Sequence, residues 1–250
     1  MYTFDSKIRY TECDMDGVLT VESLVDYFQD CSTFQTQLGP ATMEELKKDG
    51  LAWVISSWQI VINRLPKLGE DVTIGTVPYQ IKGFIGLRNF FMDTKNGERV
   101  AIANSMWSLI DLEKGIPVRA NEMILKTYPL DEKLPMDYSA RKILKPEGVP
   151  SLDGGTKKIG LHHLDTNNHV NNGQYIRIAL QSLEKLFAEG KIGSRISDKK
   201  EKIQIRVEYR QQAHLGDEIK IAVIETDECY IICLNDENNN SYAVVEIKDL

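Results

Sequence analysis

Apolar residues recur three or four positions apart in two parts of the chain, which is the spacing of one helix face. The first set precedes the stop signal Gly39-Pro40 and consists of Leu24, Tyr27, Phe28, Cys31 and Phe34. The second set consists of Tyr175, Ile176, Ala179, Leu180, Leu183, Leu186 and Phe187. The sequence therefore predicts one long amphipathic helix in each half of the chain.

Segments with the composition and alternation of β-strands follow each helical pattern. In the first half they are 51–62, 72–77, 82–92 and 99–110, and 7–10 is a short strand ahead of the helix. In the second half they are 201–209, 220–225, 229–234 and 242–247. Asn96-Gly97 predicts a β-hairpin, because both turn positions tolerate a positive φ. The predicted fold class is α+β, in which each half wraps an antiparallel sheet around its own helix.

The two halves also share sequence motifs. Asp14-x-Asp16-Gly17-Val18 lines up with Asp165-x-Asn167-Asn168-His169, and each motif precedes a predicted helix. Residues 68–74 line up with 215–221 in the same way. Between the halves, 129–155 has four prolines, several charges and little periodicity, which predicts a linker. The predicted domains are therefore 1–128 and 156–250.

The composition narrows the class of function. With 250 residues and 42% hydrophobic content, the chain can bury a core as one large domain or two small ones. A net charge of −7 and a pI near 5.3 disfavour binding to nucleic acid or to anionic membranes. No apolar run is long enough to span a membrane, and residues 1–7 resemble neither a signal peptide nor a transit peptide. We expect a cytoplasmic protein.

The sequence predicts neither a metal nor a cofactor. Its four cysteines (Cys13, Cys31, Cys229 and Cys233) include no C-x-x-C pair and are expected to be reduced thiols. The histidines at 162, 163 and 169 fit no common zinc spacing. No glycine-rich loop has the strand-to-helix context that phosphate binding needs. The three tryptophans are expected to fill the core between sheet and helix: Trp53, Trp58 and Trp107.

The densest group of reactive side chains lies just before the second predicted helix. Asp165, Asn167 and His169 alternate there, and Asn171 or Asn172 is the predicted N-cap. The loop therefore ends at the positive end of a helix, which favours developing negative charge. At the matching positions the first half has Asp and Val, so only the second half keeps an imidazole that titrates near neutrality.

The pattern D-x-N-x-H-V-N-N-x-x-Y, from Asp165 to Tyr175, resembles the catalytic signature of the acyl-acyl carrier protein thioesterases. These are tandem (double) hotdog-fold enzymes that hydrolyse fatty acyl thioesters and thereby end fatty-acid synthesis. The resemblance covers nearly the whole chain. It implies two sheets joined edge to edge, one active site where a loop of one half meets the other half, and no dissociable cofactor. The first half would serve as a wall of the substrate pocket.

The resemblance places the family's catalytic Asp, Asn and His on Asp165, Asn167 and His169. The imidazole with a carboxylate partner could take or relay a proton, which is worth ~10²–10⁴-fold in rate. The Asn167 amide could donate to the oxyanion or hold the thioester, worth ~10²–10³-fold. Asp165 would fix the histidine tautomer or a neighbouring amide. Acids and amides also suit turns and caps, where they need no catalytic role.

A later segment departs from the plant members of the family. In those enzymes a strand reads E-Y-R-R-E-C, and the second Glu is credited with activating the water. This chain has Glu-Tyr-Arg-Gln-Gln-Ala at 208–213, so Gln212 replaces the acid and Ala213 the thiol. Glutamine can position a water but cannot deprotonate it. Either the base is His169 or Asp165, or the activity is lower than in the plant enzymes.

Two further residues belong to the resemblance. Glu208 is a reserve acid, although an acid on the polar face of a strand is usually only solvated. Arg64, in Asn63-Arg64-Leu65-Pro66, matches a D-R-Y-P-like segment of the family.

The expected partner is acyl carrier protein, which is acidic and should dock on local cations. The candidate groups are Lys199, Lys200 and Lys202, or Arg141, Lys142 and Lys145.

Three alternatives stay open: an acyl-coenzyme A thioesterase of the same fold, a non-catalytic acyl-binding protein suggested by Gln212, and a hotdog dehydratase. The dehydratase needs a site acid opposite the histidine, and the sequence does not place one. The chain could also form oligomers.

Overall fold

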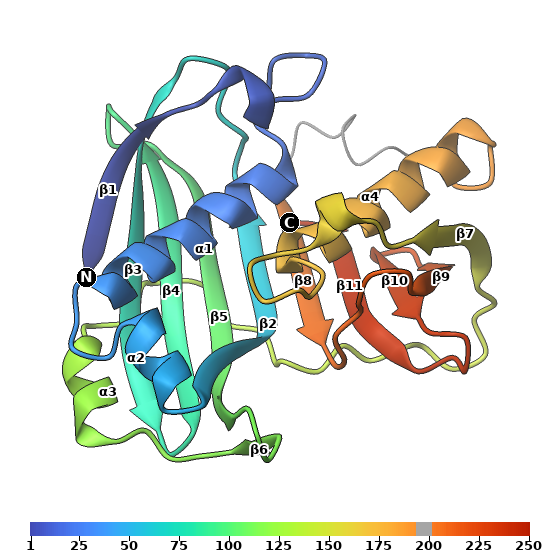
Figure 1. The fold of residues 1–250 in the computed structure, drawn as a ribbon. Coiled ribbons are helices and arrows are strands. Elements are labelled where there is room, and N and C mark those ends of the chain that lie inside the picture. The colour runs from blue at the N-terminus through green and yellow to red at the C-terminus, as the bar shows by residue number, and fades with distance from the viewer. Residues whose placement is uncertain (194–201) are drawn as a thin grey trace. The chain divides into compact units, whose positions relative to one another are not determined.

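Two units, residues 1–139 and 140–250, are built to one plan in the computed structural model, which describes residues 1–193 and 202–250 (Figure 1). The first unit contains β1 (Tyr2–Lys7), α1 (Val21–Gln37), α2 (Met43–Lys48), β2 (Leu51–Ile62), β3 (Asp71–Lys82), β4 (Ile85–Thr94), β5 (Arg99–Asp111), β6 (Ile116–Pro117) and α3 (Glu122–Thr127). The second contains β7 (Leu152–Lys158), α4 (Asn172–Ala188), β8 (Ile203–Tyr209), β9 (Glu218–Glu225), β10 (Cys229–Asn235) and β11 (Ser241–Asp249).

The strand order is the same in both units. The first sheet runs β1-β3-β4-β5-β2, and the second runs β7-β9-β10-β11-β8. All of these neighbours pair antiparallel. The long helix α1 lies across one face of the first sheet, and α4 packs on strands of the second (Figure 1). The predicted α+β class, one helix wrapped by an antiparallel sheet in each half, is confirmed.

The core of the first unit forms between α1 and its sheet. Phe28 of α1 packs against Trp58 of β2 and Phe90 of β4, with ring centroids 6.2 and 5.4 Å away. Trp58 therefore fills the sheet–helix core, as the sequence predicts. Phe34, which was predicted for the same helix face, is 43% exposed and packs edge-on against Phe4 instead. It lies at the border of the buried stripe, where spacing alone does not decide burial.

Both long helices begin at side-chain caps. The Thr20 hydroxyl accepts from the Ser23 N–H at the start of α1, and the Asn171 amide oxygen accepts from the Gly173 N–H at the start of α4. Asn171 is therefore the N-cap of the second helix, which decides between the two predicted candidates.

Several elements differ from the sequence-based expectation. The first strand ends at Lys7, and Tyr10–Glu12 form a 3₁₀ turn instead of a strand. The short helices α2 and α3 were not predicted. The predicted hairpin is present, but only Gly97 of its turn has a positive φ, 82°. All four cysteines are free.

The first four residues of strand β7, 152–155, lie in the segment that was predicted as a linker. The strand was not predicted because its glycines give this part of the sequence the composition of a turn. Gly154 is required by packing, since a Cβ at this position would stand 2.7 Å from Cγ2 of Ile221 on the paired strand. Within the described part of the chain, no helix is both long and apolar enough to cross a membrane.

Candidate active site

The predicted catalytic loop is a tight turn organised by one carboxylate. Oδ1 of Asp165 accepts hydrogen bonds from the backbone N–H groups of Asn167 (2.8 Å) and His169 (3.3 Å). The Asp165 N–H donates to the carbonyl of His169 at 2.8 Å. Asn168 takes the left-handed conformation, with φ of 62°, which asparagine tolerates better than most residues. The loop therefore has one defined shape before any substrate is considered.

The first unit contains the same loop. Oδ1 of Asp14 accepts from the backbone N–H groups of Asp16 and Val18, both at 3.0 Å, and the Asp14 N–H donates to the Val18 carbonyl at 2.9 Å. Gly17 has a φ of 71° where the second unit has Asn168. The predicted internal repeat thus extends to individual backbone hydrogen bonds. Asp14 makes these contacts in a loop that has no histidine. The matching contacts of Asp165 therefore stabilise the loop backbone and do not depend on the imidazole.

The second loop meets the segment that contains Gln212. The Val170 N–H donates to the Ala213 carbonyl at 3.0 Å, and the Ala213 N–H donates to the Tyr175 hydroxyl at 2.9 Å. This arrangement brings the loop, the start of α4 and the chain after β8 together. The Gln212 side chain is exposed, whereas Ala213 is completely buried.

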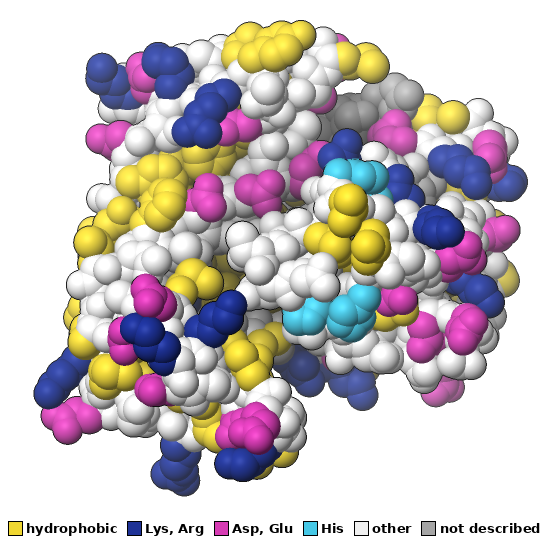
Figure 2. All heavy atoms as spheres, in the orientation of Figure 1, with side chains coloured by type: hydrophobic (Ala, Val, Ile, Leu, Met, Phe, Trp, Pro, Cys, Tyr) yellow, Lys and Arg dark blue, Asp and Glu magenta, His cyan; other side chains and the backbone are white. Residues whose placement is uncertain are grey.

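The second unit also places another imidazole beside the predicted base. The rings of His169 and His214 lie edge to face, with centroids 5.1 Å apart. Nδ1 of His214 lies 3.9 Å from Oδ2 of Asp217, which also accepts from the Tyr242 hydroxyl at 3.2 Å. Figure 2 shows histidine side chains reaching the surface of this unit. Sequence reasoning missed His214, although its position two residues after Gln212 was a usable signal.

Two buried tyrosines position the start of α4. The Tyr209 hydroxyl donates to the Asn172 carbonyl at 2.9 Å, and its ring packs edge-on against Tyr175. Burial raises the pKa of Tyr175 to about 12 and raises the pKa of Tyr209 well above its ordinary value. Both phenols therefore stay protonated near neutrality, so neither acts as the base.

Asp165, Asn167 and His169 lie in one loop, and Gln212 lies on the segment that this loop meets. Asp165 and His169 are partly buried, while the Asn167 and Gln212 side chains are exposed. Asp165 Oδ1 accepts from the backbone of Asn167 and of His169, but among the described residues no hydrogen bond joins one of these four side chains to another. The polar groups of Asn167, His169 and Gln212 are thus available to a ligand.

Two family models together match most of the chain. The model described as "Acyl-ACP thioesterase N-terminal domain" matches residues 1–128, and "Acyl-ACP thioesterase C-terminal domain" matches residues 158–248, where ACP is acyl carrier protein. The chain belongs to the acyl-ACP thioesterase family. Its two units are accordingly a double hotdog.

Plant enzymes and bacterial structures are similar to this acyl-ACP thioesterase family member. A chloroplastic acyl-[acyl-carrier-protein] hydrolase of Cuphea viscosissima is 24% identical over 82% of this chain and 50% of its own length. The chloroplastic oleoyl-acyl carrier protein thioesterase 1 of Arabidopsis thaliana is 26% identical over 88% of this chain and 63% of its own length. The chain thus spans about half to two thirds of the curated relatives it matches.

Solved structures share the fold. An acyl-ACP thioesterase from Bacteroides thetaiotaomicron superposes with a TM-score of 0.81, at 19% identity, over 98% of this chain and 96% of that chain. The 12:0-ACP thioesterase from Umbellularia californica gives a TM-score of 0.77 at 17% identity, over 99% of this chain and 96% of that chain. The double hotdog fold inferred from the sequence is therefore confirmed.

Glu208, the reserve acid, is not solvated as an acid on a polar strand face would be. It is 5% exposed, and its carboxylate accepts from Arg210 at 3.0 Å and from the Ile143 N–H at 3.1 Å. Burial would raise the pKa of Glu208, but these hydrogen bonds outweigh it and the net pKa is lowered. Strand alternation points Glu208 away from the face where Tyr209 contacts Asn172. Glu208 therefore fastens 141–143 to the sheet and does not face the loop.

His163 has a local structural role. The His163 ring is buried, and its Nδ1 accepts from the Gly160 N–H at 2.9 Å, as Glu12 Oε2 accepts from the Arg9 N–H in the first unit. Burial lowers the pKa of His163, so the ring caps its 3₁₀ turn in the neutral form. Within residues 1–193 and 202–250, no group of three or more metal-ligating side chains converges.

Arg64 braces the first unit. Its guanidinium donates to both carboxylate oxygens of Glu98 (2.8 and 2.6 Å) and both of Glu70 (3.1 and 2.6 Å). These hydrogen bonds raise the pKa of Arg64 further. The two bidentate pairs join the turn before β3 to the hairpin before β5, so the arginine shared with the family segment is structural here.

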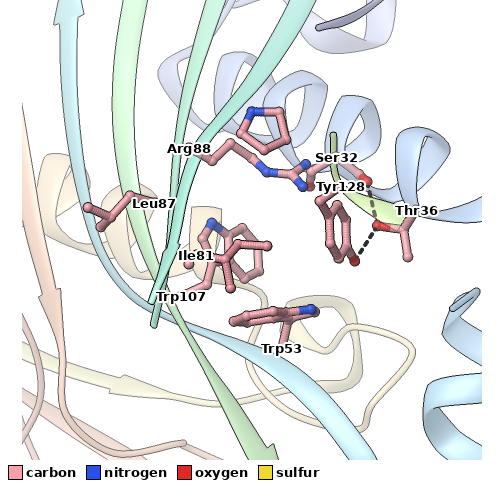
Figure 3. Close-up of a pocket in the computed structure, with 10 residues that line it drawn as sticks. Ser32, Thr36, Trp53, Ile81, Leu87, Arg88, Trp107 and Tyr128 are labelled. Carbon is pink, nitrogen blue, oxygen red and sulfur yellow. Dashed lines mark hydrogen bonds between the residues drawn. The ribbon is translucent and has the colours of Figure 1, made fainter. Parts of the chain in front are cut away.

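The first unit of this family member also has a half-open cavity between α1 and the sheet (Figure 3). Six of the lining residues are Ser32, Thr36, Trp53, Arg88, Trp107 and Tyr128. About 50 Å³ is open to the centre of a water-sized sphere, enough for a few water molecules or a small ligand group. Trp53 therefore borders the cavity as well as the core, whereas Trp107 is half-buried in the cavity wall.

Proposed function

We propose that this chain hydrolyses fatty acyl thioesters of ACP, giving free fatty acid and carrier thiol and so ending fatty-acid synthesis. One observation carries the proposal: in a chain of the acyl-ACP thioesterase family, His169 stands on an Asp165-held loop that meets residues 212–214. The substrate class comes from the names of the relatives, which describe acyl-ACP hydrolases and thioesterases.

The proposed reaction uses water as the nucleophile. The water oxygen attacks the thioester carbonyl carbon while His169 accepts a water proton. The carbonyl oxygen becomes an anion, and the Asn167 amide and the positive end of α4 stabilise it. Collapse of the tetrahedral intermediate breaks the carbon–sulfur bond, and the proton passes to the leaving sulfur. Gln212 orients the water but cannot remove its proton. Asp165 acts by holding the loop.

Thiol release from chain-matched acyl-ACP and acyl-coenzyme A tests the proposal. Acyl-ACP should be hydrolysed with the higher kcat/KM, and His169→Ala should lower kcat by ~10²–10⁴-fold with the fold intact. Faster turnover of acyl-coenzyme A would instead assign the chain to the coenzyme A branch of the same fold.

A non-catalytic acyl-binding protein is the second candidate, because Gln212 stands where the plant enzymes have an acid. Purified protein that retains acyl chains, yet turns over no faster than His169→Ala, would establish this alternative. Mass spectrometry of the acyl species after expression in a bacterial host reports retention, product and chain length together.

We also propose that the first half, 1–128, is the wall of the substrate pocket and that 156–250 contains the chemistry. Two observations support this division. The loop of the first unit has Val18 in place of the imidazole, and the cavity lies within that unit. Residues 129–155 would serve as the connection.

ACP is the proposed macromolecular partner, and docking requires exposed cations. Arg141, Lys142 and Lys145 are all exposed, as is Lys202. Lys199 and Lys200 lie outside the described residues. A net charge of −7 and free thiols fit a cytoplasmic enzyme that docks its acidic partner locally, with no nucleic acid or membrane surface involved.

A further inference from the structure

A buried arginine stands in the cavity of the first unit. Arg88, on β4, is 8% exposed, and Figure 3 shows its guanidinium reaching past the sheet towards Ser32 and Tyr128. Within the described residues its one side-chain hydrogen bond is long, 3.5 Å from Nη1 to the Thr76 hydroxyl, and no carboxylate pairs with it. Several guanidinium N–H groups thus have no acceptor in this part of the chain.

The aromatic neighbours of Arg88 make cation–π contacts with its guanidinium group and provide no hydrogen-bond acceptor for it. Its Cζ lies 5.1 Å from the Tyr128 ring centroid and 5.9 Å from that of Phe90. Such contacts use the π-face of the ring and leave the in-plane N–H groups unpaired. Burial lowers the pKa of Arg88 to about 10, so the group is still a cation at neutral pH. A buried cation without an anion is costly.

A second donor on the cavity wall is the indole Nε1 of Trp53, which is buried and makes no hydrogen bond of standard geometry within the described residues. Its neighbour Tyr128 offers an acceptor: Thr36 donates its own proton to the Ser32 carbonyl at 2.8 Å, so Tyr128 donates to Thr36 at 3.0 Å and its oxygen stays available to Trp53. Trp107 Nε1 donates to the Ser105 hydroxyl at 2.7 Å. Arg88 is thus the unmatched group of the wall, and a purely apolar ligand would leave it unsatisfied.

We propose that the cavity binds the far end of an acyl chain, that this end bears an acceptor oxygen, a carboxylate or a hydroxyl, and that Arg88 recognises this oxygen. The proposal rests on the proposed thioesterase function and specifies its substrate class. A site with unpaired buried donors favours the ligand that pairs them and discriminates against the analogue that lacks the oxygen.

The test compares acyl-ACP substrates of one chain length with three chain ends: methyl, hydroxyl and carboxylate. The wild-type protein should hydrolyse at least one oxygenated chain with a kcat/KM at least about tenfold above that of the methyl chain. Arg88→Met should reduce this preference about tenfold or more. Arg88→Gln keeps N–H donors without charge, so it should retain a preference for hydroxyl and lose one for carboxylate.

Arg99→Met is the matched control, because Arg99 lies on the same sheet but is paired with Asp93 at 2.5 and 3.0 Å. It should leave the substrate preference unchanged. A wild-type enzyme that hydrolyses the methyl chain at least as fast as both oxygenated chains overturns the proposal, whether or not the variants fold.

A binding measurement separates this proposal from the proposed function. The methyl esters of the hydroxy acid and of the plain fatty acid, and the monomethyl ester of the dicarboxylic acid, all of one chain length, are titrated into His169→Ala by calorimetry. At least one oxygenated ester should bind about tenfold more tightly than the plain ester, and adding Arg88→Met should abolish the difference. If no thioester is hydrolysed but this preference is found, the thioesterase function fails and the oxygen site stands. Equal binding of all three esters removes the oxygen site.

Discussion

The rings of His169 and His214 lie edge to face, with centroids 5.1 Å apart and planes at 74°. Asp217 holds the second histidine, because its Oδ2 accepts from the backbone N–H of His214 at 2.9 Å and lies 3.9 Å from the ring Nδ1. His214 is therefore placed to hold the His169 ring in position by contact. Such a role depends on the shape of the ring and not on its nitrogens.

The first prediction concerns His214. His214→Ala should lower kcat about tenfold, because His169 loses the ring that restricts it. His214→Phe should recover most of that loss, since it restores an edge-to-face contact without a titratable nitrogen. Thiol-release kinetics measure both variants. If Phe is as inactive as Ala while both fold normally, His214 acts through its nitrogens.

The second prediction concerns Asp165. One oxygen, Oδ1, accepts both backbone N–H groups, so Asp165→Asn should keep the loop and a kcat/KM within about tenfold of the wild type. Asp165→Ala should lower the free energy of unfolding by about 1–2 kcal/mol and reduce kcat/KM about 100-fold.

The matched control for Asp165 is Asp14→Ala in the first unit. It removes the same two backbone contacts, so we expect a similar loss of stability with hydrolysis retained. Denaturant unfolding and thiol release are measured on the same preparations. A fully folded Asp165→Asn protein as inactive as Asp165→Ala would show that the negative charge itself is needed.

The third prediction concerns Gln212. Gln212→Glu places an acid beside the loop, in the position that the plant enzymes use, and should raise kcat about tenfold because a carboxylate can take a proton from water. Gln211→Glu is the control, since Gln211 is the adjacent exposed amide. An unchanged kcat in Gln212→Glu would mean that this side chain does not reach the attacking water.

The fourth prediction concerns Asp26 on α1. Burial, and then the negative charges of Asp30, Glu22 and Glu12, raise the pKa of Asp26 to about 6. The folded state therefore holds this proton more tightly than the unfolded chain, and the associated stability is lost as pH rises from about 4 through 6. Asp26→Asn removes the ionisation and should stabilise the protein at pH 7 but not at pH 4.

The full pKa shift corresponds to about 3 kcal/mol, and partial exposure of the side chain reduces the expected gain at pH 7 to roughly 1–2 kcal/mol. Urea unfolding at pH 4, 5, 6 and 7 measures it. Asp49→Asn at the exposed end of α2 is the control and should give the wild-type curve. Equal stabilisation by Asp26→Asn at pH 4 and pH 7 would contradict the role of ionisation.

The parts of the fold that the sequence predicts are those with a strong repeating signal. The helix face from Leu24 to Cys31 was found because its periodicity is determined by burial. The strand 51–62 was found because it is rich in β-forming residues. Strand β7 was missed because Gly154, which is required by the closeness of Ile221, looks like part of a turn. The helices α2 and α3 are too short to show a period.

The candidate site also contains residues that the sequence predicts and residues that it does not. Asp165, Asn167 and His169 form a local motif, so they can be recognised from the sequence alone. His214 and Arg88 are single residues whose surroundings come from distant parts of the chain. Arg88 in particular is a lone cation in an apolar strand, and only the folded cavity shows that it lacks a partner.

The loop 14–18 of the first unit has the backbone of the candidate catalytic loop without its amide and imidazole side chains. Two substitutions, Asp16→Asn and Val18→His, would install an amide and an imidazole on backbone that already has the required shape. The surroundings would still differ: Leu19 N–H donates to the Pro66 carbonyl, as Val170 N–H does to Ala213, so Lys67 stands where His214 does. The two units thus share the loop backbone, and the side chains on and around it determine whether either loop can react.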